Sequence, residues 1–440
     1  MAIAAFHSAL WVSVAILIYQ GGLAIYRLFF HPLARFPGPK LAALTYWYEC
    51  LQDIFAGQGG DYMNQVERMH DAYGPIVRVT PDEVHVKDPE WSHVLYAGQG
   101  HIRDKDPSLA HAAGSADGTF GTVSHHVHRR RRVPVSSYFS KISVAEMQDK
   151  IWERVGHMCD VLREYHRDMI KVAEKYFQEH AVMSNSEERS RDATSYRARG
   201  GSHTLFHTLL ASDLPANEKL SKRIAQEGFE TLLAGSDPTA RAMGVAVYHI
   251  LANPDVANRL RKELEGVLPS PHDVVDLKVL ENLPWLASTK NSCIKEALRI
   301  GKLTDHRLSL IATEEDLQYK QWLMPAGTRI SMNPTRNSYD PRFFPAPMKY
   351  TPERWLQSSE EHLAAMNHVF MPFAAGKRGC LGMHFARAEL QIGLARMFRQ
   401  FEFELFDTVR ERDIDHTWAH ISGEPSKKGK GLRFKVVKCL

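Results

Sequence analysis

Cysteine is scarce in this 440-residue chain. The five cysteines lie far apart and form no CxxC pair: Cys50, Cys159, Cys293, Cys380 and Cys439. This spacing argues against a disulfide scaffold and against a structural zinc site. A single cysteine is ordinarily a buried, inert thiol, and we expect that of all of them except Cys380.

The chain also lacks a strong charge of either sign. Its formal net charge is +4, which is too small to indicate a nucleic-acid-binding protein. It contains no internal repeat and no GxGxxG or GK[ST] phosphate loop. With 44% hydrophobic residues, it can bury a large core as one big domain or two ordinary ones.

The N-terminal region has no acidic residue before Glu49. Residues 9–30 are apolar apart from Gln20 and Arg27, and about 20 such residues span a hydrocarbon core of about 30 Å. No small-residue cleavage site follows. The pattern therefore predicts an uncleaved transmembrane anchor over 9–30, in preference to a signal peptide or a buried helix.

Residues 31–40 contain three prolines and a glycine, which bar a helix and predict a short, stiff hinge. The basic residues Arg27, Arg35 and Lys40 on this side of the anchor favour a cytosolic body. We expect that body to comprise residues 41–440.

The body has mainly helical patterns. We predict helices over 144–183, 220–251 (broken at AGSDPT, 234–239), 255–267, 296–300 and 386–401. We predict a hairpin over 75–89, strands and turns over 317–332, a closing strand over 431–437, and an exposed polar loop over 184–202. The fold class is therefore mainly α with small β-sheets.

The segment FAAGKRGCLG, residues 373–382, has the features that a metal-binding thiolate needs. Gly376 and Gly382 permit tight turns and close approach to a flat cofactor, and Phe373 could form an apolar lid. Arg378 could pair with the carboxylates of a cofactor. A helix beginning near residue 383 would place its positive end beside the thiolate of Cys380. A phosphate-binding turn is the weaker alternative.

This FxxGxRxCxG segment resembles the haem-binding signature of cytochrome P450. Glu296-Ala-Leu-Arg299 matches the ExxR pair of that family, and residues 352–355 match its PERW segment. The resemblance implies the P450 fold, haem b as cofactor and Cys380 as the axial ligand of the iron. It also implies that Glu296, Arg299 and Arg354 form a buried ionic network that supports the cysteine loop.

The resemblance implies cations for the haem propionates as well. His128 and Arg132 have the family's spacing on one helix face, and Arg307 resembles a second propionate-binding arginine. For the basic run 129–131 we favour docking of an acidic reductase over a merely solvated face. The histidine group 125, 126 and 128 is a poor metal site, because no carboxylate or cysteine stands at ligand spacing.

Segments such as HPLARFPGPKLAALT and YGPIVRVTPDEVHVKDPE resemble fungal members of the family in secondary metabolism. That likeness implies a monooxygenase in the endoplasmic reticulum membrane with a cytosolic catalytic domain. It would receive electrons from NADPH through NADPH-cytochrome P450 reductase. Its substrate would be an apolar terpenoid, polyketide or alkaloid intermediate.

Two features depart from the family pattern. Where the family's oxygen-activating helix carries a proton-delivering threonine, this chain has Pro238. Asp237 remains, Thr239 could substitute if the helix bulges by one residue, and Ser236 is another candidate. In addition, family-like sequence stops near residue 159 and resumes near 168. The loss of middle helices would expose apolar faces, unless the chain repacks.

Three hypotheses follow. The first is a monooxygenase. The second is a haem-thiolate isomerase, dehydratase or peroxide-using enzyme, which would need no proton relay. The third is a catalytically impaired, truncated member left by an incomplete gene model or by gene decay. The monooxygenase is the main hypothesis, and the intact cysteine, ExxR and PERW motifs argue against the third.

Overall fold

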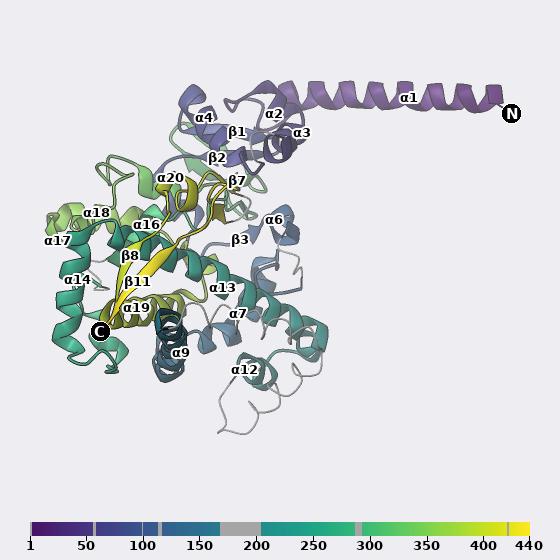
Figure 1. The fold of residues 1–440 in the computed structure, drawn as a ribbon. Coiled ribbons are helices and arrows are strands. Elements are labelled where there is room, and N and C mark those ends of the chain that lie inside the picture. The colour runs from purple at the N-terminus through teal and green to yellow at the C-terminus, as the bar shows by residue number, and fades with distance from the viewer. Residues whose placement is uncertain are drawn as a thin grey trace.

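The fold is seen in a computed structural model, which describes residues 2–55, 59–98, 100–112, 117–167, 204–286, 293–419 and 422–440 (Figure 1). The predicted loop over 184–202 lies outside these residues, as does the last part of the helix predicted over 144–183.

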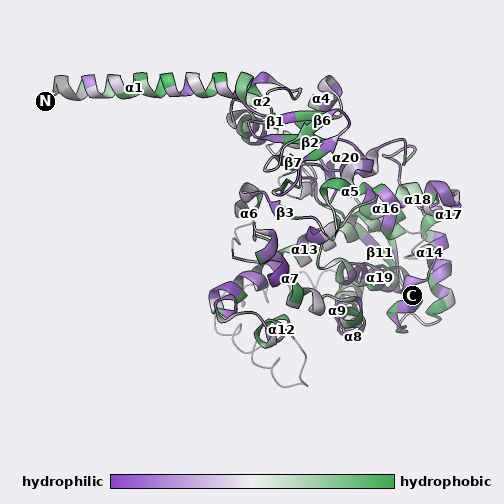
Figure 2. Cartoon of the chain, turned by 180° about the vertical axis from the view of Figure 1, so that it is seen from behind, coloured by the Kyte–Doolittle hydropathy of each residue, from purple (hydrophilic) through white to green (hydrophobic). Residues whose placement is uncertain are grey.

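The N-terminal helix α1 (Ala2–Ile25) continues as the π-helix η1 (Tyr26–Phe30). It begins earlier than the predicted start at residue 9. In Figures 1 and 2 it stands clear of the body. Its stretch Phe6–Phe30 is long and apolar enough to cross a membrane, and it is not buried against the protein.

The residues that follow α1 pack on the body. Leu33 and Phe36 are buried, and the Phe36 ring lies 5.0 Å from that of Trp322. The guanidinium of Arg78 donates to the carbonyl oxygens of Arg27 (2.8 Å) and Leu33 (3.4 Å). Because carbonyls on both sides of the junction are held by one buried side chain, the connector has a defined path along the body.

The largest sheet has five strands in the order β1-β2-β7-β4-β3, and β2 and β7 are its only parallel pair. Its strands are β1 (Ile76–Thr80), β2 (Glu83–Val86), β3 (Arg103–Lys105), β4 (Leu310–Ala312) and β7 (Arg329–Ser331). The predicted hairpin is β1–β2, with Ile76 opposite Val86.

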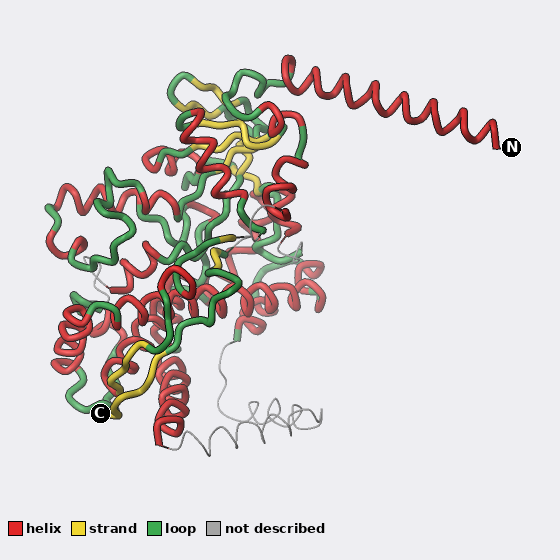
Figure 3. Tube along the Cα trace, turned by 45° about the horizontal axis from the view of Figure 1, so that its top comes forward, coloured by secondary structure: helices red, strands yellow, loops and turns green. Residues whose placement is uncertain are grey.

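Three two-stranded sheets complete the β structure of the described residues. They pair β5 (Leu317–Tyr319) with β6 (Trp322–Met324), β8 (Phe401–Leu405) with β11 (Phe434–Cys439), and β9 (Trp418–Ala419) with β10 (Gly423–Glu424). These pairs confirm the strands expected over 317–332 and at the C-terminal end. In Figure 3, strands gather near the base of α1 and beside the C-terminus, and helices form most of the rest.

The major helices are α7 (His125–Tyr138), α8 (Lys141–Glu146), α9 (Gln148–Arg167), α13 (Ser221–Leu251), α14 (Pro254–Val267), α16 (Cys293–Ile300), α18 (Glu360–Val369) and α19 (Met383–Gln400). Shorter helices are α2 (Lys40–Leu44), α3 (Trp47–Cys50), η2 (Leu51–Phe55), α4 (Tyr62–Tyr73), η3 (Pro89–Trp91), α5 (Ser92–Leu95), α6 (Pro107–Ala112), α12 (Leu205–Ala211), η5 (Ala216–Lys219), α15 (Leu277–Glu281), η6 (Arg336–Tyr339), α17 (Arg354–Gln357), η7 (Gly376–Arg378) and α20 (Arg410–Asp413).

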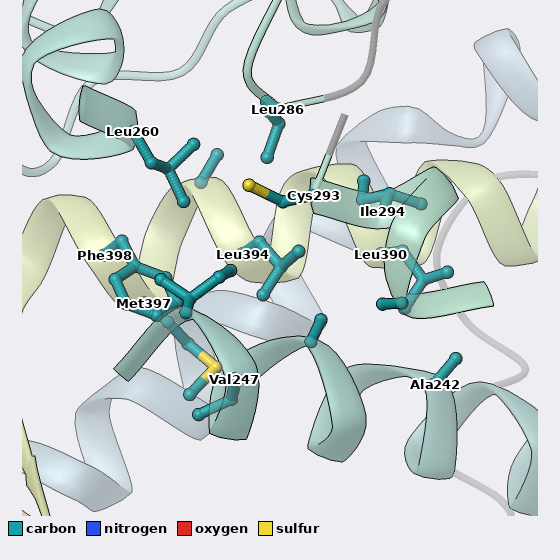
Figure 4. Close-up of a cluster of buried hydrophobic side chains, with 14 of the residues drawn as sticks. Ala242, Val247, Leu260, Leu286, Cys293, Ile294, Leu390, Leu394, Met397 and Phe398 are labelled. Atoms are coloured by element: carbon teal, nitrogen blue, oxygen red, sulfur yellow. The ribbon is translucent and has the colours of Figure 1, made fainter. Parts of the chain in front are cut away.

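The main core lies around α19, which packs against α9, α13 and α14. Figure 4 shows Leu394 of α19 and Val247 of α13 meeting in this core, together with Leu260 of α14 and Cys293 of α16. Apolar residues recur along α19 on more than one face, which is the pattern of a helix surrounded by others. This core therefore holds α19, which directly follows the Cys380 loop, and α16, which carries the ExxR motif.

Helix α13 differs from the prediction in one respect. The chain remains an ordinary α-helix through Pro238, although a break at AGSDPT was expected. Proline has no backbone N–H, so residue 238 cannot donate a hydrogen bond to the carbonyl of Ala234. The rest of this 31-residue helix is nevertheless helical. Packing of its later half, where Val245 and Ile250 are buried, outweighs that local loss.

An apolar face of α13 is uncovered, as the short middle of the sequence predicts. Leu232 is 71% exposed, and Phe229 and Leu233 are exposed beside it. Leu210 of α12 is exposed as well. Such a face is unusual in a soluble domain, because apolar side chains in contact with water cost free energy.

Candidate functional site

The loop of Cys380 connects α18 to α19 and folds back on itself. The backbone N–H of Cys380 donates to the carbonyl of Phe373 (2.8 Å), and that of Gly379 donates to Gly376 (3.2 Å). Cys380 is exposed. The N–H of Gly382 points at its sulfur, and α19 begins at the next residue. The sulfur thus lies open at the N-terminus of a long helix.

Gly376 has a φ of +67°, and a Cβ at this position would lie 2.4 Å from the carbonyl oxygen of Tyr96 and 2.5 Å from that of Ala97. Both the backbone conformation and the close approach require glycine. The sequence predicted a tight turn here, and the structure adds the reason: the turn packs on the chain after α5. Gly382, in contrast, has nothing within 4 Å of its Cβ position, so this side of the loop leaves room for a flat group.

Cys380 is exposed on one side, but the protein around the thiol desolvates it and raises its pKa, while the Gly382 N–H and the cation of Arg132 act in the opposite direction. The protein alone therefore favours the neutral thiol. A metal cation bound to sulfur would favour the thiolate, because metal ligation and deprotonation are coupled.

Two arginines flank the cysteine. Arg132 on α7 donates to the carbonyl of Gly379 (2.6 Å), and Arg378 donates to the carbonyls of Thr122 (2.6 Å) and Val123 (2.7 Å). Within the described residues, neither guanidinium forms an ion pair with a carboxylate. Burial lowers the pKa of Arg378 to about 10. Asp104 acts on Arg378 only from beyond ion-pair distance. Two partly buried cations without an ion-paired carboxylate are suited to a ligand that carries negative charge.

His128 lies close to both arginines. Burial lowers its pKa to about 2, with further lowering by Arg378 and Arg132. The imidazole is therefore neutral and can donate one hydrogen bond. His125, on the same helix, accepts a hydrogen bond from the backbone N–H of Arg103 (3.3 Å) through Nδ1.

Lys105 is a further cation of this group that sequence reasoning missed. It is buried on β3, and its ammonium donates to the carbonyl of Phe120 (2.5 Å). Burial lowers its pKa to about 7, and Arg378 adds to this. No motif marks Lys105, because its place depends on β3 lying beside α7.

The structure does not bring Arg307 to these cations. Its guanidinium pairs with Glu83 (2.9 Å) and with Glu49, and it lies over the ring of Tyr62. Burial by itself would lower the pKa of Arg307, but Glu83 and Glu49 raise it well above its usual value. Two carboxylates thus compensate the buried charge, so the assignment of Arg307 to a haem propionate is not what the structure shows.

Glu296, Arg299 and Arg354 lie together where α16 meets α17. The carboxylate of Glu296 accepts from Nε (2.9 Å) and Nη2 (2.8 Å) of Arg299 and from Nε of Arg354 (3.1 Å). It also accepts from the indole N–H of Trp355 (2.9 Å) and the backbone N–H of Thr351 (3.0 Å). Glu296 and Arg299 are fully buried. Every oxygen of this buried carboxylate is therefore bonded, and α16 is fixed to α17.

The residues expected to move protons lie on α13. Asp237 is exposed, and the hydroxyl of Ser236 donates to the carbonyl of Leu232 within the helix (2.7 Å). The bulge on which the Thr239 assignment depends is absent, because α13 is a regular α-helix here. Successive residues point about 100° apart in such a helix, so Thr239 does not take the direction of Pro238.

The basic run of α7 divides into two parts. Arg129 and Arg130 are exposed, whereas Arg131 pairs with the buried Glu218 (2.7 Å). Arg129 and Arg130 therefore remain candidates for docking a reductase, whereas Arg131 does not, because it is already paired.

The family model described as Cytochrome P450 matches residues 122–430. The chain is 31% identical to cytochrome P450 monooxygenase MO6277 of Ascocoryne sarcoides, over 95% of this chain and 96% of that protein. It is 32% identical to conidiogenone synthase PchP450 of Penicillium rubens, over 94% of this chain and 96% of the relative. The chain belongs to the cytochrome P450 family, whose members hold haem by a cysteine thiolate. Its relatives are monooxygenases of fungal secondary metabolism, and like them it is an oxidoreductase.

Solved structures agree on the fold. The retinoic acid-bound cyanobacterial CYP120A1 has a TM-score of 0.67 at 19% identity, over 92% of this chain and 99% of the other.

The alignment with MO6277 runs over 503 positions, more than the 440 residues of this chain. That relative therefore contains residues without a counterpart here, in agreement with the short middle.

Proposed function

We propose that this chain is a haem-thiolate monooxygenase that inserts one oxygen atom from O2 into an apolar secondary metabolite. The observation that carries this proposal is the open sulfur of Cys380 beside Arg132 and Arg378, two cations that lack anionic partners within the described residues. A haem has both an iron for the sulfur and two propionates for the cations.

In this proposal Cys380 holds the iron, and Phe373 and the open side of Gly382 accommodate the macrocycle. Arg132, Arg378 and neutral His128 hold the propionates. Haem, when bound, supplies the redox chemistry that activates dioxygen. The protein's own work is to hold that group, orient the substrate, exclude water and deliver protons.

Asp237 is the proposed proton carrier, with Ser236 and water as the remaining members of the relay. Support comes from its exposure on α13 and its place in the family's oxygen-activating segment. Pro238 removes the hydroxyl expected beside it. We expect the wild-type protein to release hydrogen peroxide at the expense of product, and Pro238→Thr to release less per NADPH. Tight coupling in the wild type would contradict this idea.

A second candidate is a haem-thiolate isomerase, dehydratase or peroxide-using enzyme. Pro238 in a regular helix favours it, because such reactions need no hydroxyl at this position. Turnover without NADPH and reductase separates the two candidates.

The proposed setting is the endoplasmic reticulum membrane, with α1 and η1 forming a single anchor over 9–30, residues 31–40 as the hinge and the domain 41–440 in the cytosol. The exposed Trp47, Ile54 and Phe55 near the base of α1 support contact with the lipid surface (Figure 1).

Exposed Arg129 and Arg130 are proposed to dock an acidic NADPH-cytochrome P450 reductase. Reversing both to glutamate should slow electron transfer from the reductase and leave the haem spectrum unchanged. The same reversal at Lys427 and Lys428, which lie outside the α7 run, is the control.

The substrate class is proposed from relatives. One of them is named conidiogenone synthase and another tryptophan 6-hydroxylase, of Fusarium equiseti. A terpenoid, polyketide or alkaloid intermediate fits this range.

The decisive experiment is a carbon monoxide difference spectrum of the reduced full-length protein. A Soret band at the family's thiolate position supports haem ligation by Cys380. Its absence would overturn the proposal and favour an impaired, truncated family member.

A further inference from the structure

The β9–β10 sheet near the C-terminus is fastened to α13. Thr417 donates its backbone N–H to Glu424 (2.9 Å), and the carboxylate of Glu424 pairs with the guanidinium of Arg241. On its other side, Ala419 donates to the carbonyl of Gly60 (2.9 Å). The sheet is thus held between α13 and the N-terminal part of the body.

Arg241 follows Pro238 by three residues and Ala234 by seven, so the three share one face of α13. The sheet is consequently attached one helical turn after the proposed oxygen-activating segment.

His416 lies two residues before β9, and its two ring nitrogens are shut off from solvent and have no hydrogen-bond partner among the described residues. The hydroxyl of Thr417 and Nε of Arg241 share this condition. Buried polar groups in folded proteins almost always have partners, because leaving them unpaired costs stability. These buried donors and acceptors lack hydrogen-bond partners, and the cluster therefore indicates a bound polar group.

The charged groups that face His416 are already engaged. Asp305 pairs with Arg336 (2.6 Å), and the ammonium of Lys302 lies 4.4 Å from the centre of the Tyr339 ring. Nothing among them completes the hydrogen bonding of the imidazole. Burial, with Arg241 next, lowers the pKa of His416 to about 3, so the ring is neutral and offers one donor and one acceptor.

Gly423 holds the imidazole in place. A Cβ on Gly423 would lie 2.2 Å from Nδ1 of His416 and 2.6 Å from the carbonyl oxygen of Lys302. Any larger residue at 423 would displace the ring. The position of the ring is therefore a built feature of the β9–β10 sheet.

We propose that His416 and Thr417 bind a hydroxyl or carbonyl group of the substrate. The substrate is then an otherwise apolar molecule that already carries an oxygen function. This inference rests on the proposed function for its setting. An ordered water bonded to His416 is the competing occupant.

The first test measures thermal unfolding of the full-length, ligand-free protein. His416→Leu and Thr417→Val remove open polar groups, so the unfolding midpoint should stay the same or rise. The matched control is His249→Leu. His249, on α13, is also buried, but its ring stacks on that of Tyr350, with the ring centres 4.7 Å apart. The control should lower the midpoint. A drop for His416→Leu as large as that of the control overturns the proposal.

The second test compares two probes of matched shape, adamantane and 1-adamantanol, by spectral titration of the haem-loaded protein. The wild type should bind the alcohol up to about tenfold more tightly, the size of one good hydrogen bond. His416→Leu should abolish this preference, and so should Gly423→Ala, which keeps the imidazole but displaces it. A wild type without the preference, or a His416→Leu protein that retains it, overturns the proposal.

The two tests keep the hypotheses apart. A missing thiolate Soret band refutes the proposed function, while the unfolding test of His416 still stands. A normal band refutes only the role of His416 if the His416→Leu protein keeps the preference for the alcohol, or if its unfolding midpoint falls as far as that of the control.

Discussion

Replacing Glu296 by glutamine tests the ionic network most directly. The side chain keeps its shape, but its negative charge is lost and one oxygen becomes an NH2 group. Arg299, which is fully buried, then loses the charge that compensates it. The NH2 group also faces donors from Arg299, Arg354 or Trp355, with which it cannot bond.

The magnitude follows from burial. Removing one partner of a buried ion pair costs about 3–5 kcal/mol. Unfolding entropy is about 2.1 cal/mol/K per residue, so a chain of this length loses about 1 °C of midpoint per kcal/mol. Glu296→Gln should therefore lower the unfolding midpoint by about 3–5 °C. Circular dichroism of the full-length protein in detergent measures it.

The control is Glu281→Gln. Glu281 pairs with Lys141 at 2.8 Å, with the lysine 60% exposed. An exposed pair contributes at most about 1 kcal/mol, so this variant should shift the midpoint by about 1 °C or less. If Glu296→Gln shifts the midpoint no more than Glu281→Gln does, the network does not stabilise the fold as argued.

Three further predictions concern the loop and its cations. Cys380→Ser should abolish the thiolate Soret band of the reduced carbon monoxide complex, whereas Cys439→Ser should retain it; a band that survives in Cys380→Ser would assign the ligand elsewhere. Gly376→Ala should lower the unfolding midpoint more than Gly327→Ala, because both have positive φ but only Gly376 meets backbone within 3 Å; equal shifts would show that the close approach is unimportant. Burial lowers the pKa of Lys105 to about 7, so the folded chain binds fewer protons than the unfolded chain between about pH 7 and 10.5, and stability should rise with pH there. Lys105→Met should reduce that slope, and an unchanged slope in a pH series of unfolding midpoints would refute the role of Lys105.

Several elements were predictable because their signals are local. The hairpin β1–β2 follows from alternation of apolar and polar residues, and α19 from a helical pattern directly after the cysteine loop. The N-terminal helix follows from one apolar run. The cysteine loop was found because glycine, arginine and cysteine stand at fixed short spacings, which the backbone converts into one turn.

Other features depend on which distant elements meet. Arg307 had a motif-based role, yet two carboxylates on β2 and α3 lie beside it, and a buried guanidinium takes the nearest compensating charge. Lys105 joins the cations only because β3 lies against α7. A proline breaks many helices, but α13 remains continuous because its later half is buried.

The sequence by itself determined the family, the iron-binding cysteine as a candidate, the ExxR partners and the N-terminal apolar helix. In each case the information lies within a few residues of chain or in the order of short motifs. Only the tertiary structure decided which cations gather around Cys380, and that His416 faces α13 with both nitrogens open. Those outcomes depend on long-range packing, which sets the distances between charges and the supply of hydrogen-bond partners, and no local pattern records either.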